Sequence, residues 1–111
     1  MDIYTFDVYQ GDKFTAGINI NDDAGLPMNL SGYDARGTIR TSYSAPGIQN
    51  FNCSFVNPVS GTLALSLSSL ETSALPATQL LYDIEAYTSG DSDVFKILRG
   101  YVNVYPEVTH V

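Results

Sequence analysis

Apolar and polar residues alternate along most of this chain, and this alternation constrains the fold more than any other feature of the sequence. Successive side chains of a β-strand point to opposite faces of a sheet, so a period of two predicts strands with one buried face. The pattern is clear in five stretches. The side chains expected to point inward are Phe14, Ala16, Ile18 and Ile20; Ala35, Gly37 and Ile39; Leu63, Leu65 and Leu67; Leu80, Tyr82, Ile84 and Ala86; and Leu98, Gly100, Val102 and Val104.

Two further stretches, residues 3–9 and residues 51–55, bring the number of expected strands to about seven. Short strands separated by turn residues every ~8–12 positions are typical of a sandwich of two sheets. The chain has 111 residues, which suits a single domain. We therefore predict an all-β, immunoglobulin-like antiparallel β-sandwich that occupies residues 1–111 as one domain.

Two of the connecting segments carry apolar residues of their own. Residues 68–75 contain Ser68 and Glu71 at the spacing of a capping box, which predicts a short helical turn that crosses between the sheets and ends before Pro76. A longer connector covers residues 21–32. We expect contacts with the core from Leu26, Met28 and Leu30 of the longer connector, and from Leu70, Ala74 and Leu75 of the helical turn.

The balance of charges argues against two classes of partner. The chain has 12 acidic and 5 basic residues, which gives a net charge of −7. Nucleic-acid binding and electrostatic attachment to anionic membranes both need clustered Lys and Arg, so we expect neither. Charged residues make up only 15% of the chain, against about 25% in typical domains. Together with eight tyrosines, this favours a surface that contacts other proteins.

The residue types that most often carry catalysis are scarce. His110 is the only histidine and lies second from the end of the chain, whereas nucleophilic catalysis needs a base held rigidly beside its nucleophile. Cys53 alternates with Phe51 and Phe55, so we interpret it as a small buried hydrophobe. As the only cysteine it forms no intrachain disulfide, which suits synthesis in a reducing cytoplasm.

The acidic residues do not predict a site either. Zinc sites need clusters of Cys and His, and calcium sites need converging oxygen ligands. Residues 21–23 and 91–93 are interpreted as solvated turns, since Asp and Ser are ordinary turn residues. Asp83 and Glu85 share a strand face, where we expect them to be solvated or paired with Arg36, Arg40 or Arg99. We therefore predict no enzymatic activity, no cofactor and no metal ion.

One set of outward positions is a candidate docking surface. Its tyrosines fall on one outward register of neighbouring strands, and its arginines point outward from the same region. One interpretation of this set is a surface that contacts a partner. The other is ordinary cross-strand aromatic packing. The sequence leaves both interpretations open. The candidate residues are Tyr87, Tyr101, Tyr105, Arg36, Arg40 and Arg99.

The order of the turn and strand motifs carries a family resemblance over nearly the whole chain. The matching segments are Gln10-Gly11-Asp12 with Phe14, residues 23–36 from Asp23-Ala24-Gly25 to Ala35-Arg36, Gly61-Thr62-Leu63, Leu75-Pro76-Ala77, Tyr82-Asp83-Ile84-Glu85, and residues 99–109 from Arg99-Gly100-Tyr101 to Val108-Thr109. This order resembles the small β-sandwich domain of tailed-bacteriophage structural proteins. That domain is best known at the N-terminus of the baseplate upper proteins of siphophages.

The resemblance implies a non-enzymatic virion structural protein, a tail, baseplate or neck component. Such a protein is made in the cytoplasm of the bacterial host and docks onto other virion proteins in symmetric multiple copies. The N-terminus lacks the pattern of a secretory signal, and no apolar run approaches the ~20 residues that span a bilayer. Two alternatives stay open. One is a capsid-attached decoration protein, and the other is a carbohydrate- or receptor-binding module whose exposed tyrosines stack on sugar rings.

Overall fold

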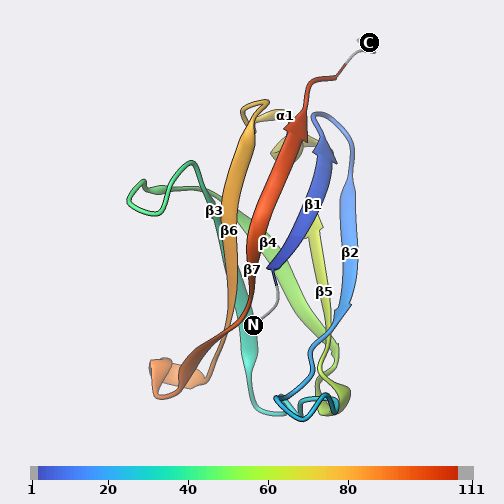
Figure 1. The fold of residues 1–111 in the computed structure, drawn as a ribbon, viewed down its shortest axis with the longest axis vertical. Coiled ribbons are helices and arrows are strands. Elements are labelled where there is room, and N and C mark those ends of the chain that lie inside the picture. The colour runs from blue at the N-terminus through green and yellow to red at the C-terminus, as the bar shows by residue number, and fades with distance from the viewer. Residues whose placement is uncertain (1–2, 108–111) are drawn as a thin grey trace.

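The computed structural model describes residues 3–107, which form seven strands, one α-helix and two short 3-10 turns (Figure 1). His110 lies outside the described residues. The expected helical turn is present, and the capping box predicted between Ser68 and Glu71 begins it. The elements are β1 (Ile3–Tyr9), β2 (Phe14–Asn19), β3 (Asp34–Arg40), β4 (Gly47–Asn57), η1 (Pro58–Ser60), β5 (Thr62–Leu67), α1 (Ser69–Ser73), β6 (Gln79–Tyr87), η2 (Ser89–Asp91) and β7 (Val94–Tyr105).

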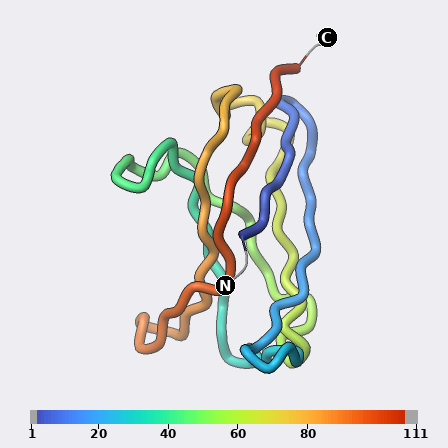
Figure 2. The backbone as a smooth tube through the Cα atoms, viewed as in Figure 1, coloured from blue at the N-terminus to red at the C-terminus, as the bar shows by residue number. Residues whose placement is uncertain are grey.

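The strands follow the order β1-β7-β6-β3-β4-β5-β2. Strand β4 pairs with β3 through its first half and with β5 through its second half, so it passes from one layer of the sandwich to the other. Strands β3, β6 and β7 therefore lie in one sheet, and β2, β5 and the end of β4 lie in the other (Figures 1 and 2). This division of strands is that of an immunoglobulin-like sandwich, and the predicted fold class is confirmed.

Strand β1 makes the only parallel pairing among the strands of residues 3–107. It lies beside β7, with Ile3 opposite Arg99 and Tyr9 opposite Tyr105. The approach is close at Gly100, where an added Cβ would lie 1.8 Å from the backbone oxygen of Tyr4. A residue without a side chain is therefore needed for β1 to join this sheet.

The core lies between the two layers and is made of the side chains that the alternation placed inward. Phe6 of β1 packs against Phe14 of β2, with ring centroids 5.4 Å apart, and against Phe51 and Tyr82. This aromatic cluster joins the two edge strands of the sandwich across the core. The fully buried core side chains include Val8, Leu30, Ile39, Leu63, Leu65, Leu67, Leu80, Ile84, Leu98 and Val102.

Three apolar residues expected to cover the core point into solvent instead. Leu26 is 62% exposed, because Asp22 Oδ1 accepts hydrogen bonds from the backbone N–H groups of Ala24 and Leu26 and curls this loop outward. Leu70 is 82% exposed, and Ala74 is exposed as well. Thr72 is the buried residue of the five-residue helix, and Leu75, three positions further along, is buried just after the helix ends.

Candidate docking face and its pocket

The candidate residues lie on the sheet made by β1, β7, β6 and β3, on the side that faces away from the core. We call this side the outer face. The register places the residues in cross-strand rows: Arg36 lies opposite Glu85, Arg40 opposite Leu81, and Asp83 opposite Arg99. The outer face does not gather all six candidate residues into one patch. They fall into three groups along the strands.

The first group lies where β6 ends and contains Arg36 and Tyr87. The guanidinium of Arg36 donates hydrogen bonds to Glu85 and to both carboxylate oxygens of Asp91, at 3.2 and 3.3 Å for Asp91. It also lies over the ring of Tyr87, with Cζ 4.3 Å from the ring centroid. These internal contacts hold both side chains in place, with an arginine stacked on an aromatic ring.

The second group lies at the opposite end of β7, around Tyr105. Its ring centroid is 5.2 Å from that of Tyr9, directly across the β1–β7 ladder. Its hydroxyl donates a hydrogen bond of 3.4 Å to Asp7, and the charge of the Asp7 carboxylate raises the pKa of Tyr105. Both rings remain substantially exposed, so this pair is cross-strand packing that still presents an aromatic surface.

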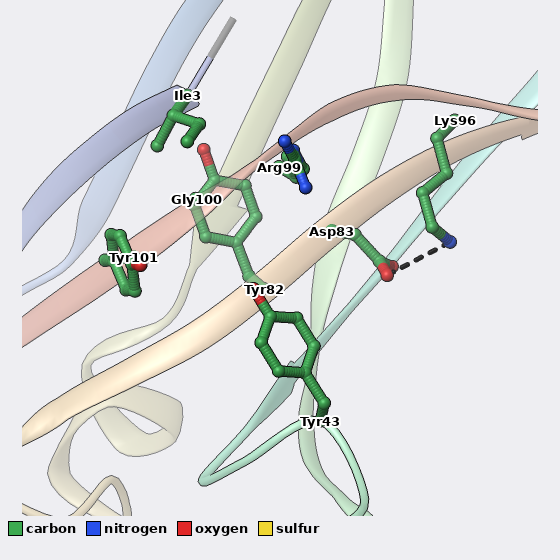
Figure 3. Close-up of a pocket in the computed structure, with 8 residues that line it drawn as sticks. All are labelled: Ile3, Tyr43, Tyr82, Asp83, Lys96, Arg99, Gly100 and Tyr101. Atoms are coloured by element: carbon green, nitrogen blue, oxygen red, sulfur yellow. Dashed lines mark ion pairs between the residues drawn. The ribbon is translucent and has the colours of Figure 1, made fainter. Parts of the chain in front are cut away.

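The third group lies between them and lines a pocket of about 310 Å³ (Figure 3). Arg99 and Tyr101 come from β7, and Asp83 comes from β6, where its carboxylate lies 3.1 Å from Nζ of Lys96. Ile3 closes one side of the pocket, from the start of β1.

The loop between β3 and β4, residues 41–46, completes the pocket. It carries Tyr43, which is 82% exposed and lines the pocket with its ring pointing toward β6 (Figure 3). The guanidinium of Arg40 donates a hydrogen bond of 2.7 Å to the backbone oxygen of Ala45. Arg40 therefore holds the loop that presents Tyr43, rather than standing free on the face.

Sequence reasoning missed Tyr43, Ile3 and Lys96, which also line the pocket. Tyr43 lies in a loop of Ser, Pro and Gly residues without periodicity, where nothing in the local pattern indicates which strand it approaches. Ile3 lies on a predicted strand, but alternation does not indicate which strand pairs with it, and the parallel pairing with β7 brings it to the pocket. The one available signal was a tyrosine in a short loop of small residues.

The remaining reactive groups are held in structural roles. Cys53 is half-buried against the core, and burial raises the pKa of its thiol to about 11, which keeps it protonated near neutral pH. Glu85 pairs with Arg36, as expected for this strand face, and Asp83 pairs with Lys96. Within residues 3–107, no three His, Cys, Asp or Glu side chains come together in a way that would hold a metal ion. None of the helices in that range has the length and apolar composition of a membrane-spanning helix.

Comparisons with known proteins yield likenesses to solved structures alone. No protein-family model matches the chain, and no curated protein matches it. Among solved structures, it is similar to a chain in the crystal structure of ICOS in complex with ICOS-L and an anti-ICOS-L VNAR domain, with a TM-score of 0.45 and 12% sequence identity. The match covers 95% of this chain and 56% of that chain, so this protein spans little more than half of its length.

Proposed function

We propose that this chain is a non-enzymatic structural component of a bacteriophage particle, in the tail, baseplate or neck. It acts by docking its outer face onto other virion proteins, in symmetric multiple copies. The virion role is inferred from the sequence resemblance, and the docking is inferred from the residues that the outer face exposes. The protein is made in the bacterial host and resides in the virion.

The observation that carries this proposal is the exposure of large apolar and aromatic side chains on the outer face. Burying such side chains in a contact contributes ~25 cal/mol per Å² of apolar area removed from water. Tyrosine and arginine, which this face also presents, are the residue types that dominate binding energy in protein interfaces. The exposed residues are Ile3, Tyr9, Tyr43, Val94 and Tyr105.

The charges of the outer face also suit a contact surface. Arg36 is paired with Glu85 and Asp91, and Lys96 is paired with Asp83. An isolated charge is costly to bury, and a paired charge is less so. The face can therefore lose water on docking without a matching charge on the partner for each of these groups.

Immunogold labelling of particles from the phage or prophage that encodes this chain tests the proposal. Gold at the tail, baseplate or neck is the expected result, and gold over the head would make the chain a capsid-attached decoration protein. Particles should be labelled both intact and after partial disruption, which exposes epitopes buried in the assembly. Absence of label in both preparations would contradict a virion role.

A second candidate is a carbohydrate- or receptor-binding module, which the pocket favours. Tyr43 and Tyr101 line the same pocket as the polar groups of Asp83 and Lys96, a combination that suits stacking on a sugar with hydrogen bonds to its hydroxyls. A glycan array probed with the wild-type chain and with Tyr43→Ala tests it. Binding that disappears in the variant would support this candidate, and an array without signal would contradict it.

A further inference from the structure

Among the described residues, the ion pairs around the pocket leave one arginine, Arg99, without a carboxylate partner. Asp83 lies directly opposite Arg99 in the β6–β7 ladder, but the carboxylate of Asp83 is paired with Lys96. No ion pair joins Arg99 to a carboxylate of residues 3–107, and its side chain is exposed. Its guanidinium is the group of the pocket lining that suits a carboxylate, because it offers planar, paired donors.

The walls of the pocket suit a ligand that is partly apolar. Its volume of about 310 Å³ lies at the lower end of the range for sites that bind small ligands, roughly 300–1,000 Å³. Ile3, Tyr43 and Tyr101 supply apolar and aromatic surface. The occupant therefore needs an apolar body and an anionic end.

We propose that this pocket receives a Glu or Asp side chain, together with an adjacent apolar residue, from a protein partner. The carboxylate accepts hydrogen bonds from the guanidinium of Arg99, with the fork geometry that favours bidentate pairing. The adjacent apolar residue packs against Tyr43 and Ile3. The inference rests on the proposed function, since it names the chemistry by which the outer face recognises a virion protein.

The surroundings of the pocket favour a protein partner over an acidic saccharide. The pocket lies between the two end groups of the outer face, and Ile3 and Tyr101 share strands β1 and β7 with the exposed pair Tyr9 and Tyr105. Residues that dominate protein interfaces cluster near the centre of a wider contact surface and are enriched in Tyr and Arg. A saccharide would use the pocket but would leave the rest of this aromatic surface uncovered.

NMR titration of the ¹⁵N-labelled full chain tests the inference. The probe is the capped dipeptide acetyl-Leu-Glu-amide, and the matched control is acetyl-Leu-Gln-amide, which keeps the shape and removes the charge. We expect the acidic peptide to shift the backbone amides of Gly100 and Tyr101 with a millimolar Kd, and the neutral peptide to leave them unchanged. Arg99→Gln should weaken binding at least tenfold. Lys13→Gln removes an exposed base elsewhere and should bind as the wild type does.

Three results would overturn the inference. They are equal shifts from the two peptides, unchanged affinity in Arg99→Gln with a well-dispersed spectrum, and shifts from glucuronate in the absence of shifts from the acidic peptide. The last result would assign the pocket to acidic saccharides. The titration needs no particle, so it separates the two proposals. Peptide binding by a chain that never labels particles would support the pocket and contradict the virion role. Labelled particles without peptide binding would support the virion role and contradict the proposed use of the pocket.

Discussion

Asp83 lies opposite Arg99 across the β6–β7 ladder, yet its carboxylate pairs with Nζ of Lys96 at 3.1 Å. The register of the two strands shifts between Ile84 and Glu85, and this irregularity places Lys96 opposite Glu85, within reach of both acids. A β-bulge of this kind re-aims side chains next to a site. Here it brings Lys96 close enough to pair with Asp83, so Asp83 does not pair with Arg99 across the ladder.

Replacing Lys96 should therefore change how Arg99 behaves. In Lys96→Gln the carboxylate of Asp83 loses its partner and becomes available to Arg99, which is then less available to an external acid. We expect the affinity for acetyl-Leu-Glu-amide to fall several-fold in this variant, although the substitution leaves Arg99 itself unchanged. The double variant Lys96→Gln/Asp83→Asn removes the competitor as well and should recover part of the affinity. Equal affinity in the two variants would show that Asp83 does not compete.

Gly100 should tolerate no side chain. A Cβ at this position would meet the backbone of Tyr4 at 1.8 Å, and a backbone cannot move aside as a flexible side chain can. We expect Gly100→Ala to lower the free energy of unfolding by ~1–3 kcal/mol, the usual cost of overpacking, and to loosen β1 from β7. Gly17→Ala is the control, since a Cβ there has no heavy atom within 4 Å. Urea unfolding of both variants measures the difference, and a stable Gly100→Ala would contradict the close approach.

Much of this sandwich could be predicted because burial imposes a period of two on strands. The inward positions of β5 and β6, such as Leu65 and Ile84, are fully buried as the alternation indicated. The capping box at Ser68 and Glu71 is also present, since it depends only on local spacing. The predictions that Leu26 and Leu70 contact the core were wrong, because irregular loops and very short helices have no period that indicates which side is buried.

The candidate site was less predictable than the fold. Which outward residues meet depends on strand order and on loops, and neither follows from alternation. The parallel pairing of β1 with β7 brings Ile3 to the pocket, and the hydrogen bond from Arg40 to Ala45 places Tyr43 there. Arg36 and Tyr87 share a face with Arg99, as expected, but they contact each other instead of the pocket.

Thr72 should be the most sensitive polar position of the helix. Its side chain is fully buried, and Oγ1 accepts a hydrogen bond of 3.0 Å from the N–H of Gly11 while donating one of 2.9 Å to the oxygen of Asp12. Thr72→Val keeps the shape and leaves both backbone groups of the β1–β2 turn without this partner, which should cost ~1–3 kcal/mol of unfolding free energy. Thr72→Ser keeps the hydroxyl and should cost less. Thermal unfolding of the pair gives the answer, and equal losses would show that the methyl group matters instead.

Glu71 should make stability depend on pH in the acidic range. Its carboxylate accepts hydrogen bonds from the backbone N–H of Ser68 and from the side chain of Asn52, and these lower its pKa in the folded protein. A lowered folded pKa contributes stability above the unfolded pKa, and this contribution is lost as pH falls through the folded pKa. Glu71→Gln should therefore be less stable than the wild type at pH 7, and the difference should shrink below about pH 4.3.

The matched control for Glu71 is Ser68→Ala. It removes the other half of the capping box at a cost of ~1 kcal/mol but keeps the backbone N–H that Glu71 binds. Its loss of stability should therefore change less with pH than that of Glu71→Gln. Urea midpoints between pH 7 and pH 3 compare the two variants. A constant difference in stability between Glu71→Gln and the wild type across that range would mean that the hydrogen bonds do not lower the pKa of the Glu71 carboxyl.

The most direct test of the account is the copy number of the chain in purified particles, measured by quantitative mass spectrometry for three versions of the encoding phage. These carry the wild-type chain, Tyr43→Ala/Arg99→Gln on the outer face, and Thr15→Ala on the exposed side of β2 as a control. The account predicts a fixed stoichiometry for the wild type and the control, and a clear loss of the outer-face variant from particles despite normal folding. Equal incorporation of all three would contradict docking through the outer face, and absence of the wild-type chain from particles would contradict the virion role.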